Sequence, residues 1–186
     1  MRIIAGKFKG RPLAAPKGQN TRPTSDRARE AIFNVLAHAD WAPALDDARI
    51  IDLFAGSGSL GLETISRGAA FSLFVETETR ARGAIRQNIE TLNLFASTQI
   101  YRRSAIALGP RPAQFDVPFD IAFLDPPYRK NLVTPALSQL LNGGWLTDTA
   151  VIMVESGADE DLDFADLAVQ SERIKGAAKV TFLTRS

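Results

Sequence analysis

A glycine-rich turn between a short apolar run and a helical pattern constrains the fold of this chain more than any other feature of its sequence. Residues 50–54 are apolar apart from Asp52, and the glycines follow them as Gly56-x-Gly58-x-x-Gly61. A helical pattern over residues 60–67 ends at Gly68. A buried strand, a tight glycine turn and a helix that begins at that turn are the parts of an open α/β sheet that binds a ligand. We therefore expect such a sheet, with its ligand at the carboxyl ends of the strands.

The rest of the chain alternates strand and helix patterns, which predicts a Rossmann-like, mostly parallel sheet with helices on both faces. We expect strands at residues 50–54, 71–75, 98–101, 119–124, 150–154, 167–169 and 180–184, and helices after Pro23 and at residues 60–67, 77–94, 104–108 and 132–141. Residues 1–23 contain six glycines and prolines between short apolar pieces, which is typical of a small hairpin. We therefore divide the chain into an arm, residues 1–23, and one domain, residues 24–186.

The charge of the chain is distributed unevenly. The net charge is +1, but residues 1–30 carry a net charge of +6 and the remainder carries −5. A basic arm on a mildly acidic body suggests a polyanionic partner, although a solvated basic tail explains the charge about equally well. No apolar run is long enough for a membrane span, and the lack of cysteine fits a cytoplasmic protein. The chain has no cysteine, which excludes thiolate metal sites and methylation of a base at a ring carbon through a cysteine nucleophile.

Two acids near the glycines indicate which ligand the turn takes. Asp52 ends the first strand and Glu76 follows the second, where a carboxylate can accept hydrogen bonds from ribose hydroxyls. Asp52 would repel a pyrophosphate, but it suits S-adenosylmethionine, which carries an ammonium and a sulfonium and no phosphate. NAD binding and a purely structural glycine turn are the alternatives to this interpretation.

A second motif, Asp125-Pro126-Pro127-Tyr128, follows the strand predicted at residues 119–124. The prolines fix the backbone and remove two amide donors, which leaves the Asp125 carboxylate and the Pro126 carbonyl as acceptors. Such acceptors can hold the two N–H groups of an exocyclic base amine, and Tyr128 offers a face on which the base can stack. A proline turn with only a structural role is the alternative. Together the two motifs predict transfer of a methyl group from S-adenosylmethionine to a base amine.

These motifs and the N-terminal half of the chain resemble a known family. Asp52-Leu53-Phe54-Ala55-Gly56-Ser57-Gly58 with Asp125-Pro126-Pro127-Tyr128 is similar to class I amino-methyltransferases. Arg22-Pro23-Thr24 and the segments 2–6, 10–13, 29–34, 60–63 and 66–69 resemble the bacterial 16S ribosomal RNA guanine-N2 methyltransferases that act on guanine 966. The resemblance covers essentially the whole chain. It implies a seven-stranded sheet with one antiparallel strand and an N-terminal hairpin that contacts RNA.

The resemblance also implies roles for individual residues. The cofactor would be held by Asp52, Phe54, Ala55, Gly56, Ser57, Gly58, Glu76, Ser104 and Asp125; the catalytic residues would be Asp125, Pro126 and Tyr128; the base would be bound by Pro127 and Tyr128. From their charge we expect RNA contacts at Arg2, Lys7, Lys9, Arg11, Arg22 and Arg129, although a solvated charge explains Arg129 about equally well. Ser104 stands where many relatives have Asp or Asn. The segment 175–179 keeps a glycine, but it lacks the aromatic residue that is often seen next to it.

The expected partner is 16S ribosomal RNA in the small ribosomal subunit, and we expect a monomer that uses no metal and contacts no membrane. Two rival functions stay open. The same turn would serve an adenine-N6 methyltransferase acting on DNA or RNA, although 186 residues leave little room for a target-recognition domain. A noncatalytic RNA-binding assembly factor that kept the fold is the other rival, and the two intact motifs argue against it.

Overall fold

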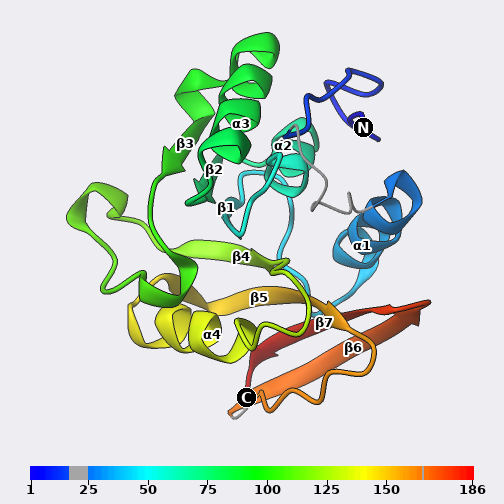
Figure 1. Ribbon diagram of the computed structural model, residues 1–186, viewed down its shortest axis with the longest axis vertical. Coiled ribbons are helices and arrows are strands. Elements are labelled where there is room, and N and C mark those ends of the chain that lie inside the picture. The colour runs from blue at the N-terminus through cyan, green and yellow to red at the C-terminus, as the bar shows by residue number, and fades with distance from the viewer. Residues whose placement is uncertain (17–24, 165) are drawn as a thin grey trace.

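The apolar runs of the chain lie side by side in one sheet. The computed structural model describes residues 1–16, 25–164 and 166–186, and Figure 1 shows the sheet with helices on both faces. The strands are β1 (Arg49–Leu53), β2 (Phe71–Val75), β3 (Thr98–Tyr101), β4 (Phe119–Leu124), β5 (Leu146–Gly157), β6 (Leu167–Lys175) and β7 (Ala178–Arg185). Their order across the sheet is β3-β2-β1-β4-β5-β7-β6, and only β7 runs antiparallel to its neighbours. The predicted mostly parallel, seven-stranded sheet with one antiparallel strand is confirmed.

The longer helices begin and end where local signals indicate. They are α1 (Asp26–His38), α2 (Ser59–Ser66), α3 (Thr79–Leu92) and α4 (Val133–Asn142). The Ser25 side chain accepts a hydrogen bond from the backbone N–H of Ala28 and so caps α1, as expected of a serine at that position. Helix α3 ends at Asn93, whose positive φ of 54° is a common helix stop. The helix predicted at residues 104–108 is only a 3₁₀ turn, Ala105–Ala107, and Gly109 and Pro110 follow it.

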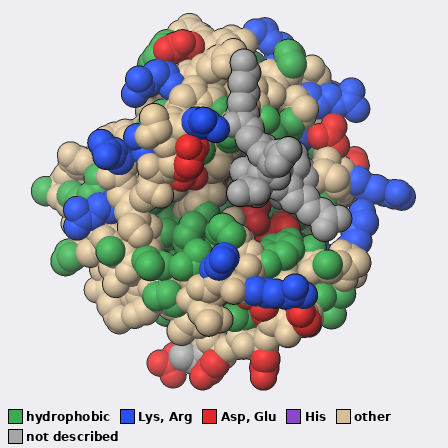
Figure 2. Space-filling view, in the orientation of Figure 1, with side chains coloured by type: hydrophobic (Ala, Val, Ile, Leu, Met, Phe, Trp, Pro, Cys, Tyr) green, Lys and Arg blue, Asp and Glu red, His purple; other side chains and the backbone are tan. Residues whose placement is uncertain are grey.

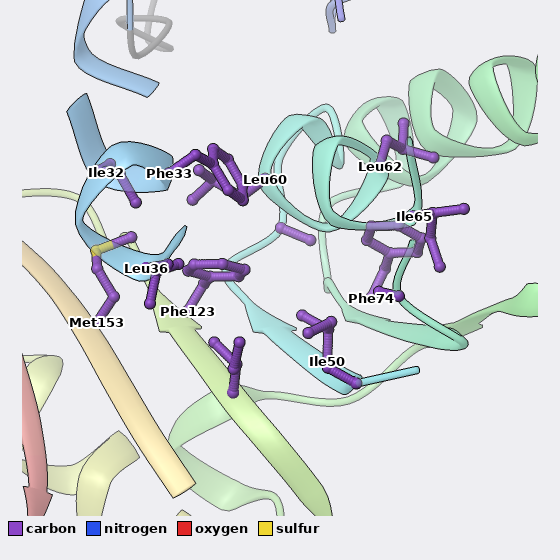
Figure 3. Close-up of a cluster of buried hydrophobic side chains, with 14 of the residues drawn as sticks. Ile32, Phe33, Leu36, Ile50, Leu60, Leu62, Ile65, Phe74, Phe123 and Met153 are labelled. Atoms are coloured by element: carbon purple, nitrogen blue, oxygen red, sulfur yellow. The ribbon is translucent and has the colours of Figure 1, made fainter. Parts of the chain in front are cut away.

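The two faces of the sheet have separate apolar cores, because successive side chains of a strand point to opposite faces. Helices α1, α2 and α3 cover one face, and Figure 3 shows Phe33 of α1 and Leu60 of α2 close to Phe123 of β4. The ring centroids of Phe33 and Phe123 are 6.0 Å apart. Helix α4 and two 3₁₀ turns cover the other face around Trp145, which is fully buried. The helices thus leave the carboxyl ends of the parallel strands as the edge where a site can form.

The last three strands are longer than the sequence predicts. β5 continues to Gly157 instead of ending at residue 154, and β6 and β7 form a hairpin that extends to a turn at residues 176–177. Most side chains of β6 after Leu167 are at least partly exposed and many are polar. Backbone pairing with a neighbouring strand therefore holds these segments extended, and no apolar pattern marks their ends.

The described part of the arm is a bridged hairpin that packs on α2. Arg2 and Pro12 form an antiparallel bridge, while Ile3 and Leu13 are buried in the core that α1 and α2 share. Buried Glu63 of α2 accepts hydrogen bonds from the backbone N–H groups of Ile4 at 2.8 Å and Ala5 at 3.0 Å. The arm therefore has a fixed place beside the helix that follows the glycine turn. The predicted division at residue 23 falls outside the described residues and stays a prediction.

Candidate functional site

The register of the parallel strands brings acidic residues together at one edge of the sheet. Leu53 of β1 pairs with Val75 of β2 and with Leu124 of β4, and Leu124 pairs with Val154 of β5. The acids of this edge, which we call the carboxylate row, adjoin these paired residues and are Glu76, Asp52, Asp125 and Glu155. By the alternation along each strand they share the face that α1, α2 and α3 cover. Figure 2 shows the hollowed centre of one face, where acidic side chains lie beside hydrophobic ones and Lys and Arg side chains stand around the rim.

The glycine loop, residues 54–58, connects β1 to α2 in a backbone conformation that favours glycine. Gly56 has a φ of 57° and Gly58 a φ of 75°. A Cβ atom on Gly58 would lie 3.1 Å from the ring of Phe74 and 3.3 Å from Ile85, so the backbone conformation favours glycine there and the packing leaves little room for a side chain. The backbone N–H of Gly56 donates to Oε2 of Glu76 at 2.9 Å. The second strand is thereby tied to the loop at the predicted cofactor site.

Asp52 is the most deeply buried acid of the carboxylate row, with 2% of its surface exposed. Burial raises the pKa of Asp52 well above its usual value, the hydrogen bond from the Gly61 N–H lowers it, and the negative charges of Asp125 and Glu76 raise it further. The Gly61 nitrogen lies 3.1 Å from Oδ2 of Asp52. A buried carboxylate beside two others favours a cationic ligand, because a positive charge would relieve both the burial and the repulsion.

A small cavity of about 50 Å³ lies next to the carboxylate row. It is lined by Phe54, Val75, Glu76, Thr77, Arg103, Ser104 and Ala105. The structure thus brings Ser104, predicted from the resemblance alone, to the same hollow as Phe54 and Glu76. A larger hollow of about 480 Å³ between α1 and β6 contains none of the predicted site residues, so size alone would misplace the site.

The Asp125-Pro126-Pro127-Tyr128 turn leaves β4 beside the glycine loop. Pro126 is buried and Pro127 is exposed, so the turn presents one proline to the protein and one to solvent. The Tyr128 hydroxyl donates a hydrogen bond to Oε1 of Glu155 on β5. The next residue, Arg129, is exposed and lies 2.8 Å from Asp159 in an ion pair. The segment that follows β5 therefore holds the turn from its outer side.

The predicted RNA-binding cations of the arm are exposed. Arg2, Lys7, Lys9 and Arg11 all face solvent. Arg2 lies 3.2 Å from Asp26, and a guanidinium nitrogen of Arg11 donates to the Thr91 carbonyl at 3.2 Å. Lys7 and Lys9 stand on the outer turn of the hairpin, where their charges are accessible to a polyanion. Arg22, the remaining predicted contact of the arm, lies outside the described residues.

Two residues that the sequence interpretation missed belong to this region. Glu155 follows the part of β5 that pairs with β4, as Asp125 follows β4, so a search for acids at every predicted strand end would have found it. Asn88 of α3 is 2% exposed and contacts both the arm and the glycine loop. Asparagine on a helix gives no recognisable signal of such a role, because its partners are backbone groups far away in the sequence.

Comparisons with known proteins place this geometry in a family. The model of the family described as Conserved hypothetical protein 95 matches residues 1–184. The chain belongs to this family. The chain is also similar to Ribosomal RNA small subunit methyltransferase D of Escherichia coli strain K12. The two sequences are 36% identical over 182 residues, which cover 98% of this chain and 87% of that protein. The Haemophilus influenzae protein of the same name is 36% identical over 163 residues, which cover 87% of this chain and 81% of that protein.

A solved structure confirms the fold of this member of the family. The structure of yhhF from Escherichia coli superposes with a TM-score of 0.86 at 35% identity, and covers 100% of this chain and 98% of that one. The fold is therefore the Rossmann-like fold of class I methyltransferases, as the resemblance implied. Within the described ranges, no helix has the length and apolar character that would let it cross a membrane. No group of three or more His, Cys, Asp or Glu side chains suited to a metal ion occurs among those same residues.

Proposed function

We propose that this chain transfers a methyl group from S-adenosylmethionine to the N2 amine of a guanine in 16S ribosomal RNA of the small ribosomal subunit. The observation that carries the proposal is the pairing of β1 with β4, which sets Asp125 and the Asp125-Pro126-Pro127-Tyr128 turn directly beside Asp52 and the glycine loop. The relatives are named as ribosomal RNA small subunit methyltransferases, which supports the substrate class. Position 966 follows from the family resemblance.

The residues at the strand ends fit this cofactor. The buried Asp52 and its acidic neighbours favour a cation, and the cavity at Glu76 and Ser104 suits a nucleoside. We assign Phe54, Ala55, Gly56, Ser57 and Gly58 to the methionine end, Glu76 to the ribose and Ser104 to the adenine. When bound, S-adenosylmethionine supplies an electrophilic methyl carbon on its sulfonium. No metal is needed, because the sulfonium already activates that carbon.

The Asp125-Pro126-Pro127-Tyr128 turn would hold and orient the base. The Asp125 carboxylate and the Pro126 carbonyl accept the two amine hydrogens, which aims the nitrogen lone pair at the methyl carbon. The same acceptors stabilise the positive charge that develops on the amine, and Asp125 can take its proton afterwards. Tyr128 and Pro127 provide the surface on which the base rests.

The arm would bind the RNA backbone outside this pocket. Arg2, Lys7, Lys9, Arg11 and Arg22 supply the positive charge, and Arg129 adds to it beside the turn. A target guanine in a loop can be turned into the pocket at a lower cost than one in a duplex. We propose that the protein does this as a monomer in the bacterial cytoplasm.

The test is methyl transfer from radiolabelled S-adenosylmethionine to small ribosomal subunits, followed by digestion of the RNA to nucleosides. The expected product is N2-methylguanosine. N6-methyladenosine would replace the proposal with the adenine alternative, and no transfer would favour the noncatalytic one. The Asp125→Ala variant should lose transfer while it still binds S-adenosylmethionine, and full activity in that variant would reject the assigned role of Asp125.

A further inference from the structure

The solvent face of helix α3 carries a glycine that nothing in the described part of the chain requires. Gly83 is exposed and lies in the interior of the helix, which spans Thr79–Leu92. A Cβ atom on Gly83 would meet no atom of the described residues within 4 Å, apart from its chain neighbours and the surrounding helix backbone. Its backbone does not adopt a positive φ. Neither packing nor backbone conformation therefore explains a glycine at this position.

A glycine in the middle of an exposed helix has a cost and one advantage. It weakens the helix relative to alanine, because glycine leaves the unfolded chain more freedom to lose on folding. In exchange, the absence of a Cβ atom lets another backbone approach the helix closely. The charges around Gly83 indicate which kind of partner could make use of this approach.

The first half of α3 is basic. Residues 79–87 contain three arginines and no acid. Arg86 is exposed and forms no ion pair among the described residues. Arg82 donates a hydrogen bond to the Thr77 carbonyl, so its guanidinium stays at the start of the helix. This half of the helix therefore suits a polyanion.

The arm extends the basic surface on one side of Gly83. The Arg11 guanidinium donates to the Thr91 carbonyl at 3.2 Å, and the side chain of Asn88 pairs with the backbone of the arm. The period of 3.6 residues places these two contacts on one flank of Gly83 and places Arg86 on the other. The exposed glycine thus lies between the cations of the arm and those of α3.

The same surface adjoins the proposed cofactor pocket. Thr77, two residues before α3, lines the cavity next to the carboxylate row. Two acids bound the basic stretch, namely Glu78, whose carboxylate caps α3, and Glu90, which lies about two turns beyond Gly83. A polyanion would therefore pass over the helix between these acids, at Gly83 and Arg86.

We propose that the backbone of the ribosomal RNA crosses α3 at Gly83, with a phosphate paired to Arg86. This inference rests on the proposed function and adds a second RNA-contact surface to that of the arm. The missing Cβ atom lets the ribose–phosphate chain lie directly against the helix. The arm and Arg86 then hold the RNA from both sides, next to the pocket that holds the cofactor.

The test uses a substitution whose effects on stability and on binding have opposite signs. Gly83→Ala removes the cost of glycine, so the midpoint of thermal unfolding should rise by about 2–4 °C. The added methyl group keeps the RNA away from the helix, so the affinity for small ribosomal subunits should fall by about five- to tenfold. The affinity for S-adenosylhomocysteine, measured by calorimetry, should stay at the wild-type value.

Thr134→Ala is the matched control. Thr134 is exposed on α4, which covers the other face of the sheet, and alanine again strengthens the helix. This variant should gain stability and keep its affinity for subunits. An equal loss of affinity in Thr134→Ala would assign the effect to stability alone. Wild-type affinity in Gly83→Ala would overturn the proposal, and so would a loss of stability, because the fold itself would then need the glycine.

A second pair of variants tests whether the partner is RNA. Arg86→Gln should reduce the slope of log affinity against log salt concentration by about 1, because one phosphate contact is lost. Arg173→Gln, at an exposed position of β6, should leave the slope unchanged. Weaker binding in Gly83→Ala with an unchanged slope in Arg86→Gln would indicate that a protein of the subunit docks on α3, and would overturn the RNA contact. Failure of the proposed function looks different, because the wild-type protein would then form no N2-methylguanosine, whatever these affinities are.

Discussion

The Nδ2 atom of Asn88 lies 3.1 Å from the backbone carbonyl oxygen of Ser57, which ties helix α3 to the glycine loop. The same side chain pairs with both backbone groups of Ala14 in the arm. Its Oδ1 accepts from the Ala14 N–H at 2.7 Å, and its Nδ2 donates to the Ala14 carbonyl at 3.0 Å. One buried amide therefore holds the proposed RNA-binding arm and the proposed cofactor loop in a fixed relation.

Replacing this amide should destabilise the protein. Asn88→Ala removes three hydrogen bonds and leaves the backbone groups of Ala14 and Ser57 without their partner, so the free energy of unfolding should fall by about 2–4 kcal/mol. Urea unfolding followed by circular dichroism measures the change. Asn142→Ala is the control, because Asn142 is exposed and, among the described residues, its side chain donates one hydrogen bond, to Oγ of Ser138 at 3.1 Å. Equal losses in the two variants would contradict the importance of the buried amide.

Substitutions at two glycines of the arm can distinguish backbone strain from loss of the contact between the arm and α2. Gly6 and Gly10 both have positive φ, but a Cβ on Gly6 would lie 1.8 Å from the Ser66 carbonyl oxygen, whereas a Cβ on Gly10 would meet nothing within 4 Å. Gly6→Ala should therefore release the arm from α2, and Gly10→Ala should cost only about 1 kcal/mol of strain. Hydrogen exchange at Lys7 and Phe8, whose N–H groups donate to Ser66, should accelerate in Gly6→Ala alone. Matching protection in both variants would argue against a docked arm.

The raised pKa of Asp52 predicts how cofactor affinity depends on pH. Asp52 takes up its proton at a higher pH than an exposed carboxyl does, because burial raises its pKa. A cationic ligand favours the charged carboxylate, so below that pKa binding must displace a proton. Affinity for S-adenosylmethionine should therefore weaken as pH falls, by up to about tenfold per pH unit. Calorimetric titrations across this range should show the effect in the wild type and lose it in Asp52→Asn. Asp148→Asn, at an exposed position of β5, should keep the wild-type dependence.

The exposed lysines of the arm should contribute to RNA binding through phosphate contacts. Each contact releases counterions, so Lys7→Gln and Lys9→Gln should each reduce the slope of log affinity against log salt concentration by about 1. Filter binding of small ribosomal subunits at several salt concentrations measures this slope. Lys175→Gln, at the turn between β6 and β7, should leave it unchanged. If all three substitutions reduced the slope equally, RNA binding would depend on the net charge of the protein and not on the lysines of the arm.

Sequence-based prediction worked best for strands whose burial produces a recognisable run of apolar residues. The bounds predicted for β2, β3 and β4 match the structure. For β2 and β4 the reason is an apolar run, which marks a strand enclosed by helices; β3 is a partly exposed edge strand and has no such run. The far end of the β6–β7 hairpin carries Arg173 and Lys175 on exposed backbone, and only pairing with β7 makes that segment a strand. Such pairing depends on the partner strand, so the sequence of the segment itself carries no pattern that predicts it.

The candidate site also has a part that could be predicted from the sequence and a part that could not. Asp52, Glu76 and Asp125 could be placed together from the sequence, because each adjoins the end of a parallel strand and such ends meet at one edge. The attachment of the arm could not be predicted. Glu63 and Ser66 bind backbone N–H groups of the arm, and hydrogen bonds from a side chain to distant backbone produce no periodicity in either segment. The contact between Tyr128 and Glu155 was missed for the same reason, since it joins a loop to a strand 27 residues away.

The carboxylate row has a consequence for turnover. Transfer of the methyl group converts a sulfonium into a neutral thioether, so the ligand loses one positive charge while Asp52, Asp125 and Glu76 stay where they are. The electrostatic attraction that would draw the reactant in would thereby be lost for the product as soon as it forms. With its acids on four adjacent strands, the sheet would bind S-adenosylmethionine more tightly than S-adenosylhomocysteine, and the reaction itself would start the exchange of spent cofactor for fresh.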